Sequence, residues 1–84
     1  MSAAAAQCLD NRDAIRIRAH RIAQSAAAAP WNTPEVLMML SRAAALEASS
    51  YDGWSRSDLD AIALWTDLTM AYAAQAWLQE MQGR

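Results

Sequence analysis

The sequence predicts an all-α fold, a three-helix bundle with a long C-terminal helix, in one domain that covers residues 1–84. Three observations support this prediction. No segment alternates between apolar and polar residues as strands do, and β-branched residues are few. Two prolines and a glycine divide the chain into three segments with helical periodicity. The last of these, residues 57–82, contains neither Gly nor Pro.

The first helix is expected over residues 3–29. Pro30 ends it, because proline cannot donate the next backbone hydrogen bond and disfavours a helical conformation at the residue before it. One face is a narrow stripe of mostly small side chains, which suits close packing against another helix: Cys8, Ile15, Ala19, Ile22 and Ala26.

The second helix is expected over residues 34–48. Thr33 is a suitable N-cap, Pro34 fits the first helical position, and Glu35 suits the positive end of the helix dipole. Its first half, VLMML, is apolar on all sides, which predicts more than one neighbour. Trp31 and Trp54 lie in the connections, and we expect them to pack against the ends of the bundle.

The third helix is expected over residues 57–82, with Ser57 or Ser55 as its N-cap. Its apolar residues form two faces, whereas a helix that lies on a single core needs only one. The rest of the chain, a second copy or a different protein must therefore cover the second face. One face contains Ala61, Leu64, Trp65, Leu68, Ala71, Tyr72 and Leu78, and the second contains Leu59, Ala63, Met70, Ala74, Trp77 and Met81.

Charge is distributed unevenly along the chain. The net charge is -2 and the isoelectric point is about 5.1, which argues against a general binder of polyanions. The first helix is nevertheless basic, and the remainder of the chain is acidic. This helix can lie against the acidic third helix, within one chain or across a dimer, or the two zones can face different partners. The basic residues concerned are Arg12, Arg16, Arg18 and Arg21.

No pattern in the sequence indicates catalysis, a cofactor or a metal. His20 is the only histidine and Cys8 the only cysteine, and neither has the partners that metal or acid–base sites require. Asp58 and Asp60 are explained by the start of a helix. We expect Asp67 to mark an exposed edge or to meet an arginine. The protein is thus predicted not to be an enzyme.

The composition predicts a cytoplasmic protein. A lone cysteine forms no internal disulfide, and residues 1–8 lack the basic and apolar regions of a signal peptide. Asp67 and Gln75 interrupt the apolar stretch of the third helix, and an aspartate near the middle of a membrane span is costly. No membrane span is therefore expected.

The function predicted is that of a non-catalytic protein–protein interaction module, a small inhibitor or adaptor that occupies a surface on a larger partner and forms a homodimer. Phage and mobile-element inhibitors, anti-CRISPR proteins included, are its most concrete version by analogy of size and class. One alternative is a nucleic-acid-binding regulator that uses the basic helix, although direct nucleic-acid binding is disfavoured by charge. Another is an enzyme with an arginine-lined site at a dimer interface. The partner-binding residues expected are Arg12, Arg16, Arg18, Arg21, Met38, Met39, Met70, Trp77 and Met81.

Overall fold

The computed structural model describes the backbone of residues 3–83 and the side chains of residues 11–83. This part of the chain contains three helices, α1 (Ala3–Ala28), α2 (Pro34–Ser49) and α3 (Arg56–Gln82), and no strand. The all-α fold with a long C-terminal helix is confirmed, with each helix end within one residue of its predicted position. The side chains of Cys8 and Asp10 lie outside the described residues.

The caps explain where α2 and α3 begin. The Thr33 hydroxyl accepts a hydrogen bond from the backbone N–H of Val36 at 3.3 Å, as the sequence predicts. At α3 the earlier of the two possible caps is used, because the Ser55 hydroxyl accepts from the N–H of Asp58 at 3.1 Å. The connection before it turns at Gly53, whose φ of +80° is readily adopted only by glycine.

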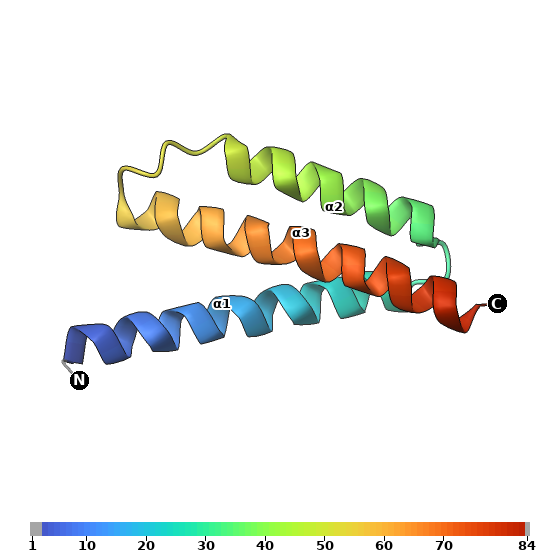
Figure 1. Ribbon diagram of the computed structural model, residues 1–84, viewed down its shortest axis with the longest axis horizontal. Coiled ribbons are helices and arrows are strands. Elements are labelled where there is room, and N and C mark those ends of the chain that lie inside the picture. Colours follow the sequence, from blue (N-terminus) through green and yellow to red (C-terminus); the bar gives the residue numbers. More distant parts are fainter. Residues whose placement is uncertain (1–2, 84) are drawn as a thin grey trace.

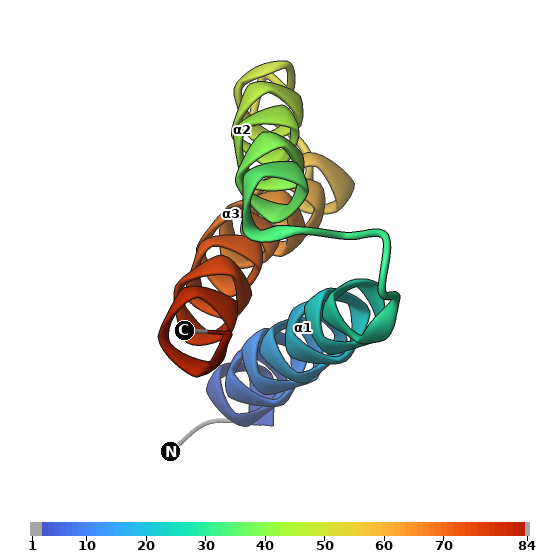
Figure 2. The same cartoon turned by 90° about the vertical axis from the view of Figure 1, so that its right-hand side faces the viewer.

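The three helices are arranged around α3. Helices α1 and α2 pack along two sides of α3 and have almost no contact with each other. Figure 2, seen along the helices, shows α3 between the other two. The Cα atoms extend over 48 × 27 × 16 Å, so the molecule is flat. As a result, α3 is the only one of the three helices that has two neighbours.

Large side chains of α3 explain why α1 and α2 stay apart. Leu68 is buried between Ala19 of α1 and Ala44 of α2, and Trp65 and Tyr72 pack beside it. These side chains fill the space in which α1 and α2 would otherwise meet. The first of the two apolar faces expected for the third helix therefore supplies the core residues Leu64, Trp65, Leu68 and Tyr72. Leu78 of the same face is 39% exposed.

The interfaces of α3 with α1 and with α2, called seams below, are narrow and rich in alanine. Leu37 is the only large side chain, among those described, that is completely buried. Two hydrogen bonds fasten the helices: Ser41 Oγ donates to the Thr69 carbonyl at 2.7 Å, and Gln79 Nε2 donates to the Ala27 carbonyl at 3.0 Å. Small residues thus bring the helices close together but bury little apolar area.

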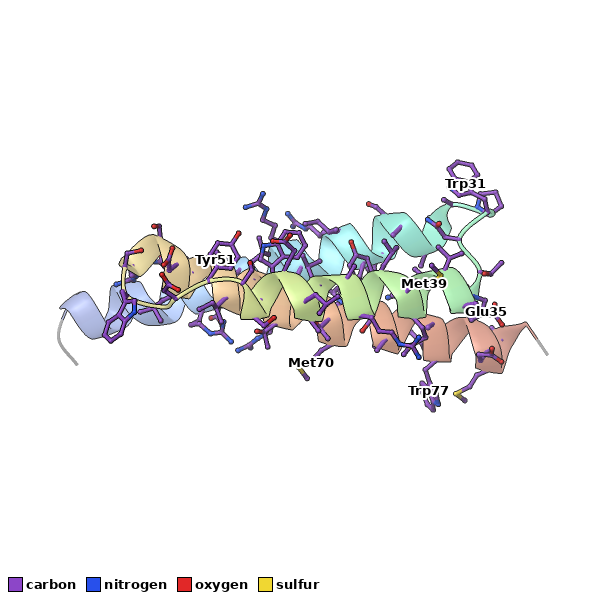
Figure 3. The ribbon with its side chains drawn as sticks, turned by 90° about the horizontal axis from the view of Figure 1, so that it is seen from above. Trp31, Glu35, Met39, Tyr51, Met70 and Trp77 are labelled. Atoms are coloured by element: carbon purple, nitrogen blue, oxygen red, sulfur yellow. The ribbon has the colours of Figure 1, made fainter. Side chains whose placement is uncertain are left out.

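The expectation that Trp31 and Trp54 pack against the bundle ends is wrong. Trp31 is 76% exposed and Trp54 is 91% exposed. Trp31 projects from the connection between α1 and α2, as Figure 3 shows. Trp31 lies in the connection between α1 and α2, which hardly touch, so its indole ring finds no closed end of the bundle to cover. The exposure of Trp54, between α2 and α3, has no such explanation in the fold.

Candidate functional site

An apolar stripe runs along the side of α3 that neither α1 nor α2 covers. At 100° per residue, its seven residues lie within about 80° of one another, opposite the buried Leu68. Met70, Trp77 and Met81 are each more than 60% exposed, and Leu59 is 53% exposed. Figure 3 shows Met70 and Trp77 projecting on the same side of the molecule. We call this set the α3 stripe: Leu59, Ala63, Thr66, Met70, Ala74, Trp77 and Met81.

The flanking contacts define the stripe as the third side of α3. Arg12 and Ala27 of α1 contact α3 at Asp67 and Gln79, respectively. On the other flank, Ser41 of α2 contacts the Thr69 carbonyl. The second apolar face of the third helix, for which the sequence left three possible covers, is therefore not covered by this chain over most of its length.

A hollow of about 580 Å³ lies between α2 and α3, next to the stripe. Trp77 belongs to both features, so the stripe and the hollow form one continuous surface. Glu35, Arg42 and Glu80 place charges of both signs around the hollow. We call it the α2–α3 hollow, and its apolar lining comes from Pro34, Met38, Met39, Ala73, Ala76 and Trp77.

The start of α2 determines which residues of its apolar half face outward. The Thr33 cap fixes the first turn, and Leu37, Ser41 and Ala44 then face α3 and are buried. Met38 and Met39 follow Leu37 by 100° and 200° around the helix, so neither can enter the same seam. They are 37% and 65% exposed, respectively.

The structure therefore brings together all five apolar residues that the sequence singled out for partner binding. Met38, Met39 and Trp77 line the α2–α3 hollow, and Met70 and Met81 continue along the α3 stripe. Leu46, which is 72% exposed on α2, was missed by the sequence analysis. Leu46 lies seven residues after Met39 and therefore on the same side of α2. This spacing indicates that Leu46 is exposed next to Met39.

The four arginines of α1 do not share one surface. Arg12 Nη1 lies 3.6 Å from Asp67 Oδ2 of α3, and Arg16 Nη1 lies 3.7 Å from Asp13 Oδ1 one turn earlier. Arg18 lines a separate hollow between α1 and α3, and Arg21 lies with Arg16 and His20 on the outer side of α1.

The structure shows where the basic first helix lies and what Asp67 contacts. Helix α1 packs against α3 within one chain, and Arg12 of α1 is paired with Asp67 of α3. Asp67 meets an arginine and does not mark an exposed edge, since its side chain is only 15% exposed.

The titratable groups of the described residues do not gather into a metal site. Residues 11–83 contain no cluster of three His, Cys, Asp or Glu side chains that could hold a metal ion. Burial raises the pKa of Tyr72, whose side chain packs against the core. No helix of the described chain is both long and apolar enough to cross a membrane.

Comparison with known proteins adds no assignment to this geometry. The chain matches no family model, no curated protein and no solved structure. Its function is therefore inferred from the surface formed by α2 and α3.

Proposed function

We propose that the protein is a non-catalytic interaction module, a small inhibitor or adaptor that acts by covering a surface on a larger protein partner. The observation that carries this proposal is the continuous exposed apolar surface formed by the α2–α3 hollow and the α3 stripe. Met39, Met70, Trp77 and Met81 each expose more than 60% of their surface there. Large contiguous apolar patches on soluble proteins mark interaction sites.

The composition of this surface suits protein recognition. Tryptophan is enriched among the residues that dominate binding energy, and methionine adapts to irregular partner surfaces. Charges lie around the apolar residues, as they do at the rims of protein interfaces. A hollow between two helices also accepts the apolar face of a third helix, which is a common mode of peptide recognition.

The arrangement of the arginines favours this proposal over nucleic-acid binding. A phosphate-binding face requires several cations that point to one side of a helix. In α1, Arg12 and Arg16 are each within 4 Å of a carboxylate. Arg18 lines a hollow between α1 and α3, so only Arg21 lies on the same outer side as Arg16. A phage or mobile-element inhibitor, such as an anti-CRISPR protein, is the most concrete version of the proposal, by analogy of size and class.

Site-specific photo-crosslinking in cells tests this proposal. A photoreactive amino acid is placed at Met39 in the hollow and, as a matched control, at Gln24, which is exposed on α1. We expect Met39 to yield a discrete product with one protein larger than this chain, and Gln24 to yield none. The absence of a discrete product at Met39, or the same products at both positions, would contradict the proposal.

A further inference from the structure

The exposed apolar surface has two parts, the α3 stripe and the α2–α3 hollow. The stripe differs from the hollow in its regular spacing and in its lack of charged residues. Resting on the proposed function, we infer that a second copy of this chain covers the stripe, with the two α3 helices antiparallel and related by a two-fold axis at Met70. In this dimer the larger partner of the proposed function binds the α2 side, where Met39 and Leu46 are exposed, and does not contact the stripe.

The spacing of the stripe is the first observation that supports this pairing. Along α3 its seven residues are separated by 4, 3, 4, 4, 3 and 4 positions, a series that reads the same in both directions from Met70. In an antiparallel pair of identical helices, residues at equal distances on either side of the two-fold axis lie opposite each other. With this spacing, every residue of the stripe lies opposite a stripe residue of the second copy.

Side-chain sizes are complementary in the same register. With Met70 on the axis, Trp77 lies opposite Ala63 of the second copy, and Met81 lies opposite Leu59. Thr66 lies opposite Ala74. The largest side chain of the stripe thus meets one of the smallest. A parallel pairing would instead place Trp77 on Trp77 and Ala63 on Ala63, with overcrowding at one level and a gap at the other.

The stripe contains no charged residue, so an antiparallel copy buries no charge along its centre. It extends over 22 residue steps, or about 33 Å of helix. Helix pairs in stable bundles also pack along several turns, so a contact of this length is ordinary. The stripe therefore satisfies the size, polarity and symmetry conditions of a helix–helix dimer seam.

The flat molecule exposes more area than a compact protein of its mass. The chain exposes 5885 Å², whereas a compact monomer of 9.2 kDa exposes about 4,900 Å². The excess, spread over the whole surface, leaves room for an interface of standard size, in which each partner buries roughly 800 Å².

The first test is the solution mass, measured by light scattering over a concentration series. We expect the parent protein to have twice the mass of the 9.2 kDa chain. Met70→Glu, which brings two carboxylates together on the axis, should have the mass of one chain. Leu46→Glu is the matched control, because Leu46 is equally exposed on α2, and it should remain a dimer. A monomeric parent would overturn the inference.

Disulfide trapping tests the register without weakening the seam. In a Cys8→Ser background, Met70→Cys places two thiols at the axis and should form a covalent dimer on oxidation. Trp77→Cys alone should not, because its two copies lie about 21 Å apart in the antiparallel register, whereas a disulfide needs Cα atoms within about 7 Å. Efficient trapping at Trp77, or none at Met70, would overturn the inference.

The two proposals fail in different ways. A parent dimer whose Met39 photo-crosslinks to no larger protein supports the stripe inference and contradicts the proposed function. A monomeric parent whose Met39 still crosslinks to a larger protein contradicts the stripe inference alone. Circular dichroism of Met70→Glu shows whether its loss of dimer mass reflects unfolding, and the trapping result decides the register in that case.

Discussion

Replacement of Arg12 by alanine tests the ion pair that joins α1 to α3. Asp67 Oδ2 is buried and accepts no hydrogen bond from any described residue. Its nearest cation is the Arg12 guanidinium, with Nη1 at 3.6 Å. Without Arg12, a carboxylate oxygen stays buried with neither a hydrogen bond nor a counter-charge. Such a buried, unpaired group lowers the free energy of unfolding.

The magnitude follows from the separation and the exposure of the pair. At 3.6 Å and an effective dielectric constant of about 20, two unit charges attract by roughly 4–5 kcal/mol before desolvation is subtracted. Exposed ion pairs contribute about 0–1 kcal/mol net, and breaking a buried pair costs about 3–5 kcal/mol. Because the Arg12 side chain is 48% exposed and that of Asp67 is 15% exposed, we expect Arg12→Ala to lower the free energy of unfolding by about 2 kcal/mol.

Urea unfolding at neutral pH and one fixed protein concentration measures this loss. Arg16→Ala is the matched control, because Arg16 pairs with Asp13 at a similar distance but both side chains are about two-thirds exposed. Its loss should stay below about 0.5 kcal/mol. Adding Asp67→Asn to Arg12→Ala should recover part of the stability. Equal losses for the two arginine variants would refute the reasoning that burial of Asp67 sets the cost.

Three further predictions concern the core. Leu37→Ala should lower the free energy of unfolding by about 3 kcal/mol, because Leu37 is completely buried; a loss under about 1 kcal/mol in urea unfolding would contradict this. Ser41→Ala should cost about 1 kcal/mol by losing the bond to the Thr69 carbonyl, and an unchanged urea midpoint would argue against that bond. Burial raises the pKa of Tyr72 above its usual value near 10, so the unfolded chain releases this proton first and stability falls as pH rises above 10. In thermal melts Tyr72→Phe should reduce this alkaline loss, and an identical pH profile would contradict the assignment.

The helices were predictable because local signals determine them. Pro30 and the Thr33–Pro34 cap mark two ends unambiguously, and the structure places those ends within one residue of prediction. The start of α3 was less certain, because Ser55 and Ser57 offer the same capping chemistry two residues apart. The structure uses Ser55, whose hydroxyl accepts from the N–H of Asp58.

The faces of the helices were predictable, but their neighbours were not. Periodicity placed Met70 and Trp77 opposite Leu68, and their exposure follows from that placement. It could not show that α1 and α2 both pack on α3 and avoid each other. That arrangement depends on how the side chains of Leu68, Trp65 and Tyr72 fill the space between α1 and α2 in three dimensions.

The open side of α3 is a consequence of how the core is built. Ala19 and Ala44 let α1 and α2 approach the central helix closely, while Leu68 fills the wedge between them. Burial of apolar area contributes about 25 cal/mol per Å², so alanine seams stabilise the fold only modestly. The larger apolar side chains of α3 beyond this wedge, Met70 and Trp77 among them, then face solvent. In the dimer proposed above, burial of these side chains would add apolar stabilisation that the alanine-rich contacts within the chain do not supply.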